Sequence, residues 1–366
     1  MRTQFATETG AALDAVRTAD AEPDVEGLMI LAAEGSDLQF DAVDSALREV
    51  SVPVFGGVFP EVLHEGDKHD AGVVVAALSV QPDVTVVPGL SDDDTDFEET
   101  LPAGIPGDGT AFVLADAYGT RVEDFVSSLF ATYGIDVTYL GGGAGSLEME
   151  QQPCLFTNDG LLADAGVLAT VDRPTSVGVK HGWEEVAGPL RVTAASGQRL
   201  SELDGEPAFE VYRRIVEDDA GVALTEGNFF EVAMSYPFGL SRLEGEKIVR
   251  DPFEVTDEGG LTCFGNVPEG EFVHVLRGDP ESLVAAAADA YREAASGRAE
   301  AGEVLFFDCI SRVLYLEDAF TRELDAVGGT GSPVVGALTI GEIANDRRGH
   351  LDYYNKTAVA AVMGAL

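Results

Sequence analysis

One local pattern occurs three times along this chain, and it constrains the fold more than any single residue does. In each copy an apolar segment of strand character leads through a short polar loop into an amphipathic segment, and then into a second apolar segment with glycines at its end. The copies span 27–57, 109–145 and 303–344. Repeated strand–loop–helix–strand units predict an α/β protein. The loops at the glycine-ended strands are candidates to meet in one place.

The pattern of apolar and polar residues changes between the second and third copies. Short alternating apolar and polar segments at 154–200 predict an antiparallel meander, and the apolar segment NFFEVAMSY at 228–236 predicts a further strand. A helix is predicted at 5–18, and the order of elements after residue 280 repeats the opening order. We therefore predict a mixed α/β (α+β) fold of two related halves, with antiparallel strands, packed sheets and helices outside.

The charge of the chain is extreme and widely distributed. Its 366 residues carry a net charge of -43 and include only four lysines. Dispersed acidity with few lysines indicates adaptation to a salt-loaded cytoplasm, where screening is strong and carboxylates hold water and cations. An acidic partner-binding surface is the alternative. Nucleic acid is excluded as a partner, because no basic stripe is present to neutralise phosphates.

Cysteine usage and the apolar runs indicate the compartment. Three cysteines lie far apart without a CxxC pair, which predicts reduced thiols. The amino terminus MRTQFATETG has no apolar leader, and the longest apolar run, at 71–80, is too short to cross a bilayer. We expect a soluble cytoplasmic protein without a membrane partner.

Cys309 and Arg312 form the first candidate site. Cys309 follows the apolar segment VLFFD, and Arg312 lies three residues later. A guanidinium at this place would bind a carboxylate through two hydrogen bonds, and it would also lower the pKa of the thiol. The pair therefore indicates either ligand contact or a nucleophile, which would need a histidine such as His181 or His350. A buried reduced thiol beside an ion pair is the third interpretation.

The other candidates are glycines, acids and one amide. Gly142, Gly143 and Gly336 either donate backbone N–H groups to a ligand or allow close strand packing, and no Rossmann or P-loop motif surrounds them. Asp116 and Glu342 lie at strand ends and would accept from an ammonium group. Asn355, near the carboxyl end, is a sheet or site residue. The acidic histidine-containing loop at 64–70 lacks zinc-site spacing, so we predict no metal and no cofactor.

Several ordered segments together resemble the FIST family, in a halophilic archaeal type. They are VGVKHGWEEVAGPLRVTAASGQRLSELDGEPAFEVY, LTCFGNVPEGEFVHVL, LFFDCISR, GALTIGEIA and YYNKTAVAAV. The resemblance implies a FIST N-terminal domain at 1–204 and a FIST C-terminal domain at 205–366, and the repeated order of elements in the two halves suggests an internal duplication. Domains of this family are regarded as sensory modules that bind small ligands, with amino acids among those suggested.

The resemblance and the candidate residues together predict a stand-alone sensor with a pocket between the halves. Its ligand would be a small metabolite, an amino acid or another carboxylate, and its signal would pass to a separate partner protein. Arg312 would take the carboxylate, Glu342 or Asp116 the ammonium, and the glycines would supply N–H donors beside Cys309 and Asn355. A cysteine-dependent hydrolase or transferase using Cys309 and a peptide-binding scaffold remain alternatives, so enzymatic activity stays open.

Overall fold

Three mixed sheets share one topology in the computed structural model, which describes residues 1–105, 109–242, 245–296, 302–328, 333–345 and 350–364. Each sheet is built on one pair of parallel strands. The pairs are β2 (Gly27–Ala33) with β3 (Val54–Phe59), β8 (Thr110–Asp116) with β9 (Thr138–Ala144), and β21 (Glu303–Cys309) with β22 (Val334–Thr339). The three sequence repeats are therefore three α/β modules, and the predicted α/β class is confirmed.

The outer side of each parallel pair is covered by antiparallel strands. One such strand pairs directly with the first strand of each module: β6 (Val73–Leu78), β12 (Ala165–Val171) and β25 (Ala358–Met363). Beyond them lie β1 (Arg2–Ala6), β7 (Asp83–Pro88) and β13 (Thr175–Lys180). Apart from the edge strands, these strands are continuous apolar runs because both faces of each sheet are covered.

The inner side of each parallel pair is completed by a hairpin from a different module. The hairpin of β10 (Leu155–Thr157) and β11 (Gly160–Leu162) follows β9 in the chain but pairs with β3. Likewise β23 (Glu342–Ala344) and β24 (Asp352–Tyr354) extend β9, while β4 (Glu61–His64) and β5 (Asp67–His69) extend β22. This cyclic exchange ties the modules together, and β3, β9 and β22 contact one another.

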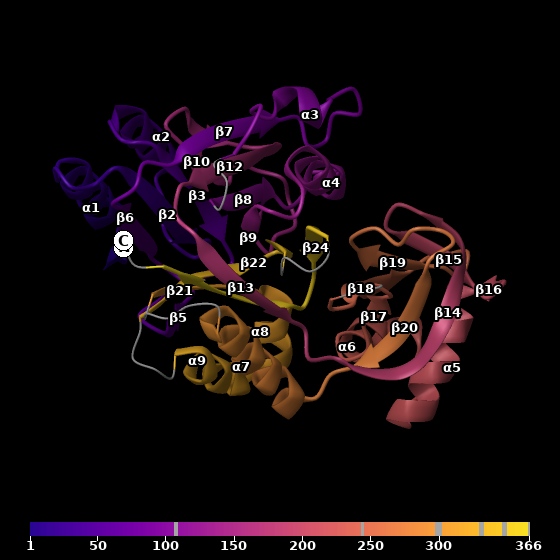
Figure 1. Cartoon of the computed structure of the whole chain (residues 1–366). Coiled ribbons are helices and arrows are strands. Elements are labelled where there is room, and N and C mark those ends of the chain that lie inside the picture. Colours follow the sequence, from indigo (N-terminus) through magenta and orange to yellow (C-terminus); the bar gives the residue numbers. More distant parts are fainter. Residues whose placement is uncertain (106–108, 243–244, 297–301, 329–332, 346–349, 365–366) are drawn as a thin grey trace.

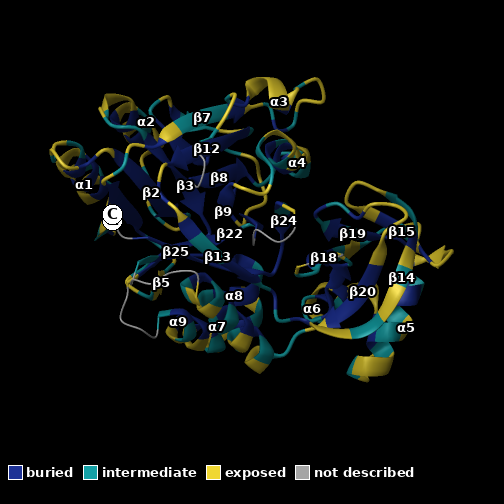
Figure 2. Ribbon diagram, viewed as in Figure 1, coloured by how far each residue is buried: buried dark blue, intermediate teal, exposed yellow. Residues whose placement is uncertain are grey.

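Helices cover the outer faces of the three sheets (Figure 1). They are α1 (Thr9–Asp20) and α2 (Phe40–Glu49), α3 (Phe97–Thr100) and α4 (Val122–Tyr133), and α7 (Pro280–Ser296), α8 (Ile310–Leu316), η2 (Glu317–Ala319) and α9 (Phe320–Gly328). Their apolar stripes face the sheets and their polar faces are exposed (Figure 2). In the described parts of the chain, none of the helices has both the length and the apolar character needed to cross a membrane.

A fourth, fully antiparallel sheet lies beside the three modules, at the right in Figure 1. Its order is β14 (Glu184–Ser196), β20 (Phe272–Arg277), β17 (Phe238–Leu240), β18 (Ile248–Val255), β19 (Leu261–Phe264), β15 (Arg199–Leu203) and β16 (Glu206–Pro207). Because β14 also pairs with β15, the sheet closes into a barrel. With it come α5 (Ala208–Ala220), η1 (Glu226–Asn228) and α6 (Phe229–Ala233).

Three local predictions are corrected by the structure. The expected meander at 154–200 does not form, because β10, β12, β13 and β14 join four different sheets. The predicted helix at 5–18 begins only at Thr9, since 2–6 form a strand on β6. The predicted strand at 228–236 is largely helical, as η1 and α6. Alternation in a short apolar run is ambiguous, and here a capping box between Thr225 and Asn228 favours the helix.

A glycine stands at the same register position in each parallel pair. Gly56, Gly141 and Gly336 lie opposite Ile30, Val113 and Phe306 respectively. A Cβ atom added at these glycines would lie 1.8, 2.0 and 1.7 Å from the carbonyl oxygen of the opposing residue. The repeated glycines thus allow the two strands of each module to approach closely.

Gly336→Ala should destabilise the protein severely, because the new methyl group meets backbone and not a movable side chain. We expect a loss of about 1–3 kcal/mol or more in the free energy of unfolding, measured by urea denaturation in molar KCl. Gly10→Ala is the matched control, since Gly10 lies in α1 with open space around it. That change should be neutral or stabilise by roughly 0.5–1 kcal/mol. Equal stabilities for the two variants would contradict the packing role of Gly336.

Candidate functional site

A cavity of about 280 Å³ lies where the second and third modules meet the barrel. Segments from all three parts line it. The second module contributes Tyr118, Leu147 and Met149, the barrel and its helix contribute Phe230, Met234, Asp251, Phe253 and Phe264, and the third module contributes Cys309, Ile310, Ser311, Leu314, Ile340, Gly341, Asn355 and Lys356. The size suits a small metabolite.

A buried ion pair forms the polar part of the cavity wall. Lys356 connects β24 to β25, and its side chain is only 1% exposed. Its Nζ atom lies 3.0 Å from Asp251 Oδ2 and donates to the carbonyl oxygen of Met234 at 3.2 Å. The same ammonium lies 5.0 Å from the ring centroid of Trp183. Pairing, hydrogen bonding and the aromatic face together compensate the loss of water around this cation.

The second carboxylate oxygen of Asp251 is not satisfied in this arrangement. Asp251 is 7% exposed, and its Oδ1 atom has no hydrogen-bond partner among the described residues. Burial raises the pKa of Asp251, and Lys356 counteracts part of that rise. A buried oxygen without a partner is costly and calls for a bound group. Among the described residues that line the cavity, Asp251 is therefore the one best suited to accept a hydrogen bond from a ligand.

The outer part of the cavity is apolar. Four large side chains that line it remain between 43% and 57% exposed. They are Leu147, Met149, Phe230 and Leu314. A group of exposed apolar side chains around a recess is typical of a binding site.

Cys309 lies at the end of β21, where α8 begins, and it lines the cavity as a protonated thiol. Burial raises the pKa of Cys309 to about 12, and the neighbouring Glu342 carboxyl adds to the rise. Backbone N–H groups of Ser311 and Lys356 lower it only in part. On balance the pKa of the thiol is therefore raised, whereas the nearby Arg312 was predicted to lower it. At neutral pH the sulfur is not an activated nucleophile.

Glu342 lies directly behind the thiol and is fully buried. Its Oε1 atom accepts from Thr339 Oγ1 at 2.8 Å, its Oε2 atom accepts from the Thr357 N–H at 3.2 Å, and the Cys309 thiol also donates to it. Burial nevertheless raises the pKa of Glu342 to about 8. The carboxyl is thus largely neutral at pH 7, and it does not itself line the cavity.

The structure places Arg312 behind the cavity and not in it. Its side chain is completely buried, and Nε and Nη2 donate to Glu323 at 3.1 and 2.8 Å. The remaining guanidinium N–H groups donate to the carbonyl oxygens of His181, Leu283 and Lys356. Asp308 Oδ1 lies 3.1 Å from Nε. Since a guanidinium has five N–H groups, Arg312 has no donor left for a ligand.

The other predicted site residues are distributed between the cavity and the module contacts. Asn355 lines the cavity, and its Nδ2 atom donates to the carbonyl oxygen of Phe264 at 3.1 Å. Gly142 pairs with Glu342, and the Gly143 N–H donates to the carbonyl oxygen of Gly341, so both glycines join the second module to the third.

Gly336 and Asp116 also lie outside the cavity lining. Gly336 is within β22, and the Oδ2 atom of Asp116 accepts from the Asp164 N–H at 2.7 Å and from Gln151 Nε2 at 3.1 Å. In the described chain no histidine lines the cavity. The imidazole of His181 faces Glu246 at 3.3 Å, and that of His350 packs on Phe130.

Sequence reasoning missed the ion pair and the residues of α6. Lys356 carried a usable signal, because it is one of only four lysines and stands between apolar strand segments. The Thr225–Asn228 capping box was a usable signal for placing Phe230 on a helix, which ends just before Met234. Asp251 lies within β18, and no local pattern distinguishes it from the many other acids of the chain.

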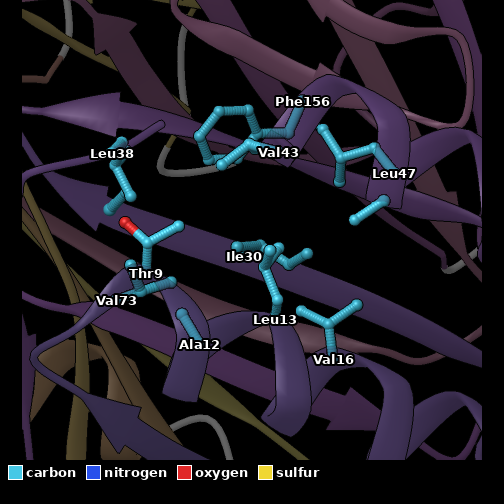
Figure 3. A pocket seen from close by; sticks show the side chains of 12 residues that line it. Thr9, Ala12, Leu13, Val16, Ile30, Leu38, Val43, Leu47, Val73 and Phe156 are labelled. Atoms are coloured by element: carbon cyan, nitrogen blue, oxygen red, sulfur yellow. The ribbon is translucent and has the colours of Figure 1, made fainter. Parts of the chain in front are cut away.

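A smaller cavity lies between α1, α2 and the first sheet (Figure 3). It measures about 20 Å³, and its lining is apolar apart from Thr9. Such a space is close to the volume that one water molecule needs. It is a packing void of the first module and offers no site for a metabolite.

Two family models match the chain in order. The FIST N domain matches residues 27–206, and the FIST C domain matches residues 208–345. The two matched segments are separated only by Pro207, the last residue of β16, directly before α5. A comparison with curated proteins gave no match.

Proposed function

Because this chain belongs to the FIST family, whose domains are in general sensory domains of signal transduction, we propose that it is a sensory protein with a small ligand in the cavity beside Asp251 and Lys356. In this proposal the two FIST domains extend over 1–204 and 205–366. The protein works in a salt-loaded cytoplasm and passes its signal to a separate partner protein.

The observation that carries the proposal is the unsatisfied Oδ1 atom of Asp251, a residue that lines a mostly apolar cavity open to solvent at its rim. Other ion-paired acids of the described chain, such as Asp308, also have a buried oxygen without a partner, but among the described residues that line the cavity only Asp251 has one. A ligand that donates to Oδ1 would remove the cost of leaving this oxygen unpaired, and the apolar rim would bury its body. Both contributions favour binding of a small molecule.

The position of the cavity suggests how binding would produce a signal. Phe230 and Asp251 belong to the barrel and its helix, whereas Cys309 and Leu314 belong to the third module. A ligand that contacts both parts stabilises one arrangement of the barrel against the modules by its differential affinity. That arrangement is what a partner protein would recognise.

A thermal-shift screen in molar KCl tests the proposal. Amines, amino acids, carboxylates, alcohols and nucleotides are compared, and a ligand of the native state should raise the melting temperature. Ser311→Trp should fill the cavity and abolish the shift, because Ser311 lines it. Ser127→Trp, on the exposed face of α4, is the matched control and should leave the shift intact. An undiminished shift in Ser311→Trp, or no shift with any class, would contradict the proposal.

A further inference from the structure

The side-chain donors of the cavity lining are largely engaged within the protein. The hydroxyl of Tyr118 donates to the carbonyl oxygen of Ser146 at 2.5 Å, Asn355 Nδ2 donates to Phe264, and the Cys309 thiol donates to Glu342. Lys356 is directed to Asp251, to the Met234 carbonyl oxygen and to the face of Trp183. A carboxylate in the cavity would therefore find its only lining cation, among the described residues, already committed.

In contrast to these donors, one hydrogen-bond acceptor of a residue that lines the cavity is free. Asp251 lines the cavity, and its buried Oδ1 atom has no hydrogen-bond partner among the described residues. An ionised carboxylate oxygen accepts its strongest hydrogen bonds from a charged donor. A ligand that donates a hydrogen bond to Asp251 is therefore favoured, and an ammonium group is the strongest such donor.

The remaining surroundings favour the same polarity. The net charge of -43 attracts cations and repels anions on approach at low salt, although molar salt screens this field. The rim side chains Met149, Phe230 and Leu314 are apolar and offer no group for a second charge on the ligand. A ligand with one cationic end and an apolar body fits both observations.

We propose that the cavity binds an apolar primary amine, whose ammonium group donates to Asp251 Oδ1 while its hydrocarbon body lies against Phe230 and Leu314. This inference rests on the proposed function, because it names the class of ligand for the same cavity. It selects against carboxylates and against zwitterionic amino acids, which bring a carboxylate that the lining does not bind.

Four compounds of matched shape test this inference by calorimetric titration in molar KCl, which suppresses unspecific binding of cations. They are 2-phenylethylamine, phenylalanine, 3-phenylpropanoate and 2-phenylethanol. The amine should bind at least roughly tenfold more tightly than any of the other three. Asp251→Asn should weaken the amine by roughly ten- to a hundredfold and leave the alcohol nearly unchanged.

Two further variants keep the test decisive. Asp352→Asn removes an acid that pairs with Arg242 outside the cavity, and it controls for the change in net charge. Phe230→Ala alters an exposed rim residue, so it should fold even where Asp251→Asn does not, and it should weaken the amine severalfold.

The outcomes separate the inference from the function on which it rests. If phenylalanine or the carboxylate binds more tightly than the amine, and Ser311→Trp blocks that binding, the amine assignment is overturned and the sensory proposal stands. If the amine binds equally well to the Ser311→Trp and Asp251→Asn variants, both fail. If none of the four compounds binds, the amine assignment is overturned, and the broader thermal-shift screen decides the sensory proposal.

Discussion

Replacing Arg312 with methionine should reduce the free energy of unfolding by about 3–5 kcal/mol, because it leaves buried carboxylates without their cation. Arg312 and its partners Asp308 and Glu323 are all completely buried. Burial already raises the pKa of Asp308 well above its usual range, and the Arg312 guanidinium acts against that rise. Without the guanidinium, the carboxyls must take up protons or separate, and either costs folding free energy.

Urea unfolding followed by tryptophan fluorescence measures this loss of stability, and the tryptophan signal comes from the surroundings of Arg312. Trp183 is the single tryptophan of the chain, it is buried, and it donates to the same Lys356 carbonyl oxygen that Arg312 contacts. Arg322→Met is the matched control, since Arg322 forms an exposed ion pair with Glu281. Its loss should leave the urea midpoint close to that of the wild type, because solvent screens an exposed pair. If both variants unfold at the wild-type urea concentration, the carboxyls do not need the guanidinium.

Replacing Glu342 with glutamine should flatten the pH dependence of stability between pH 4.5 and 8. In the unfolded chain this carboxyl loses its proton near its ordinary pKa of 4.5, whereas in the folded protein burial raises its pKa to about 8. The stability linked to this proton is therefore fully present below pH 4.5 and is lost as the pH rises through 8. For one group the slope is at most about 1.4 kcal/mol per pH unit.

The comparison of variant and wild type isolates this carboxyl, because Asp251 and Asp308 also have raised pKa values and slope in the same direction in both proteins. The free energy of unfolding is measured by urea titration at several pH values in constant molar KCl. Glu281→Gln serves as the control, since the exposed Glu281 has a pKa lowered by Arg322 and titrates below this window. An unchanged slope in Glu342→Gln would show that the carboxyl is ionised in the folded protein.

The α/β class and the three repeats were readable from local pattern. An apolar run of strand length followed by an amphipathic segment predicts a strand and a helix, because the hydrophobic periodicity that distinguishes them extends over only a few neighbouring residues. The glycines that end these strands were visible as well. Their role was not, because the choice between ligand contact and close packing depends on what stands opposite. At Gly336 the backbone of Phe306 stands directly opposite, which shows that this glycine serves close strand packing.

The candidate site was only partly readable. Cys309 and Asn355 were predicted and line the cavity, whereas Asp251 and Lys356 come from distant segments that only the packing of barrel and module brings together. Arg312 and Glu342 were plausible ligand residues from their sequence positions. The structure buries both behind the cavity, where Arg312 donates to protein groups alone.

The sequence by itself determined the modules, their order and the acidic surface, because each follows from nearby residues or from composition. Tertiary structure alone decided which strand completes which sheet, since the edge of a sheet accepts any strand that reaches it with the right register. It alone also decided the state of the charged groups. The pKa of the Cys309 thiol and the pairing of Lys356 depend on water being excluded by segments far away in the chain, and desolvation is a property of the packed molecule.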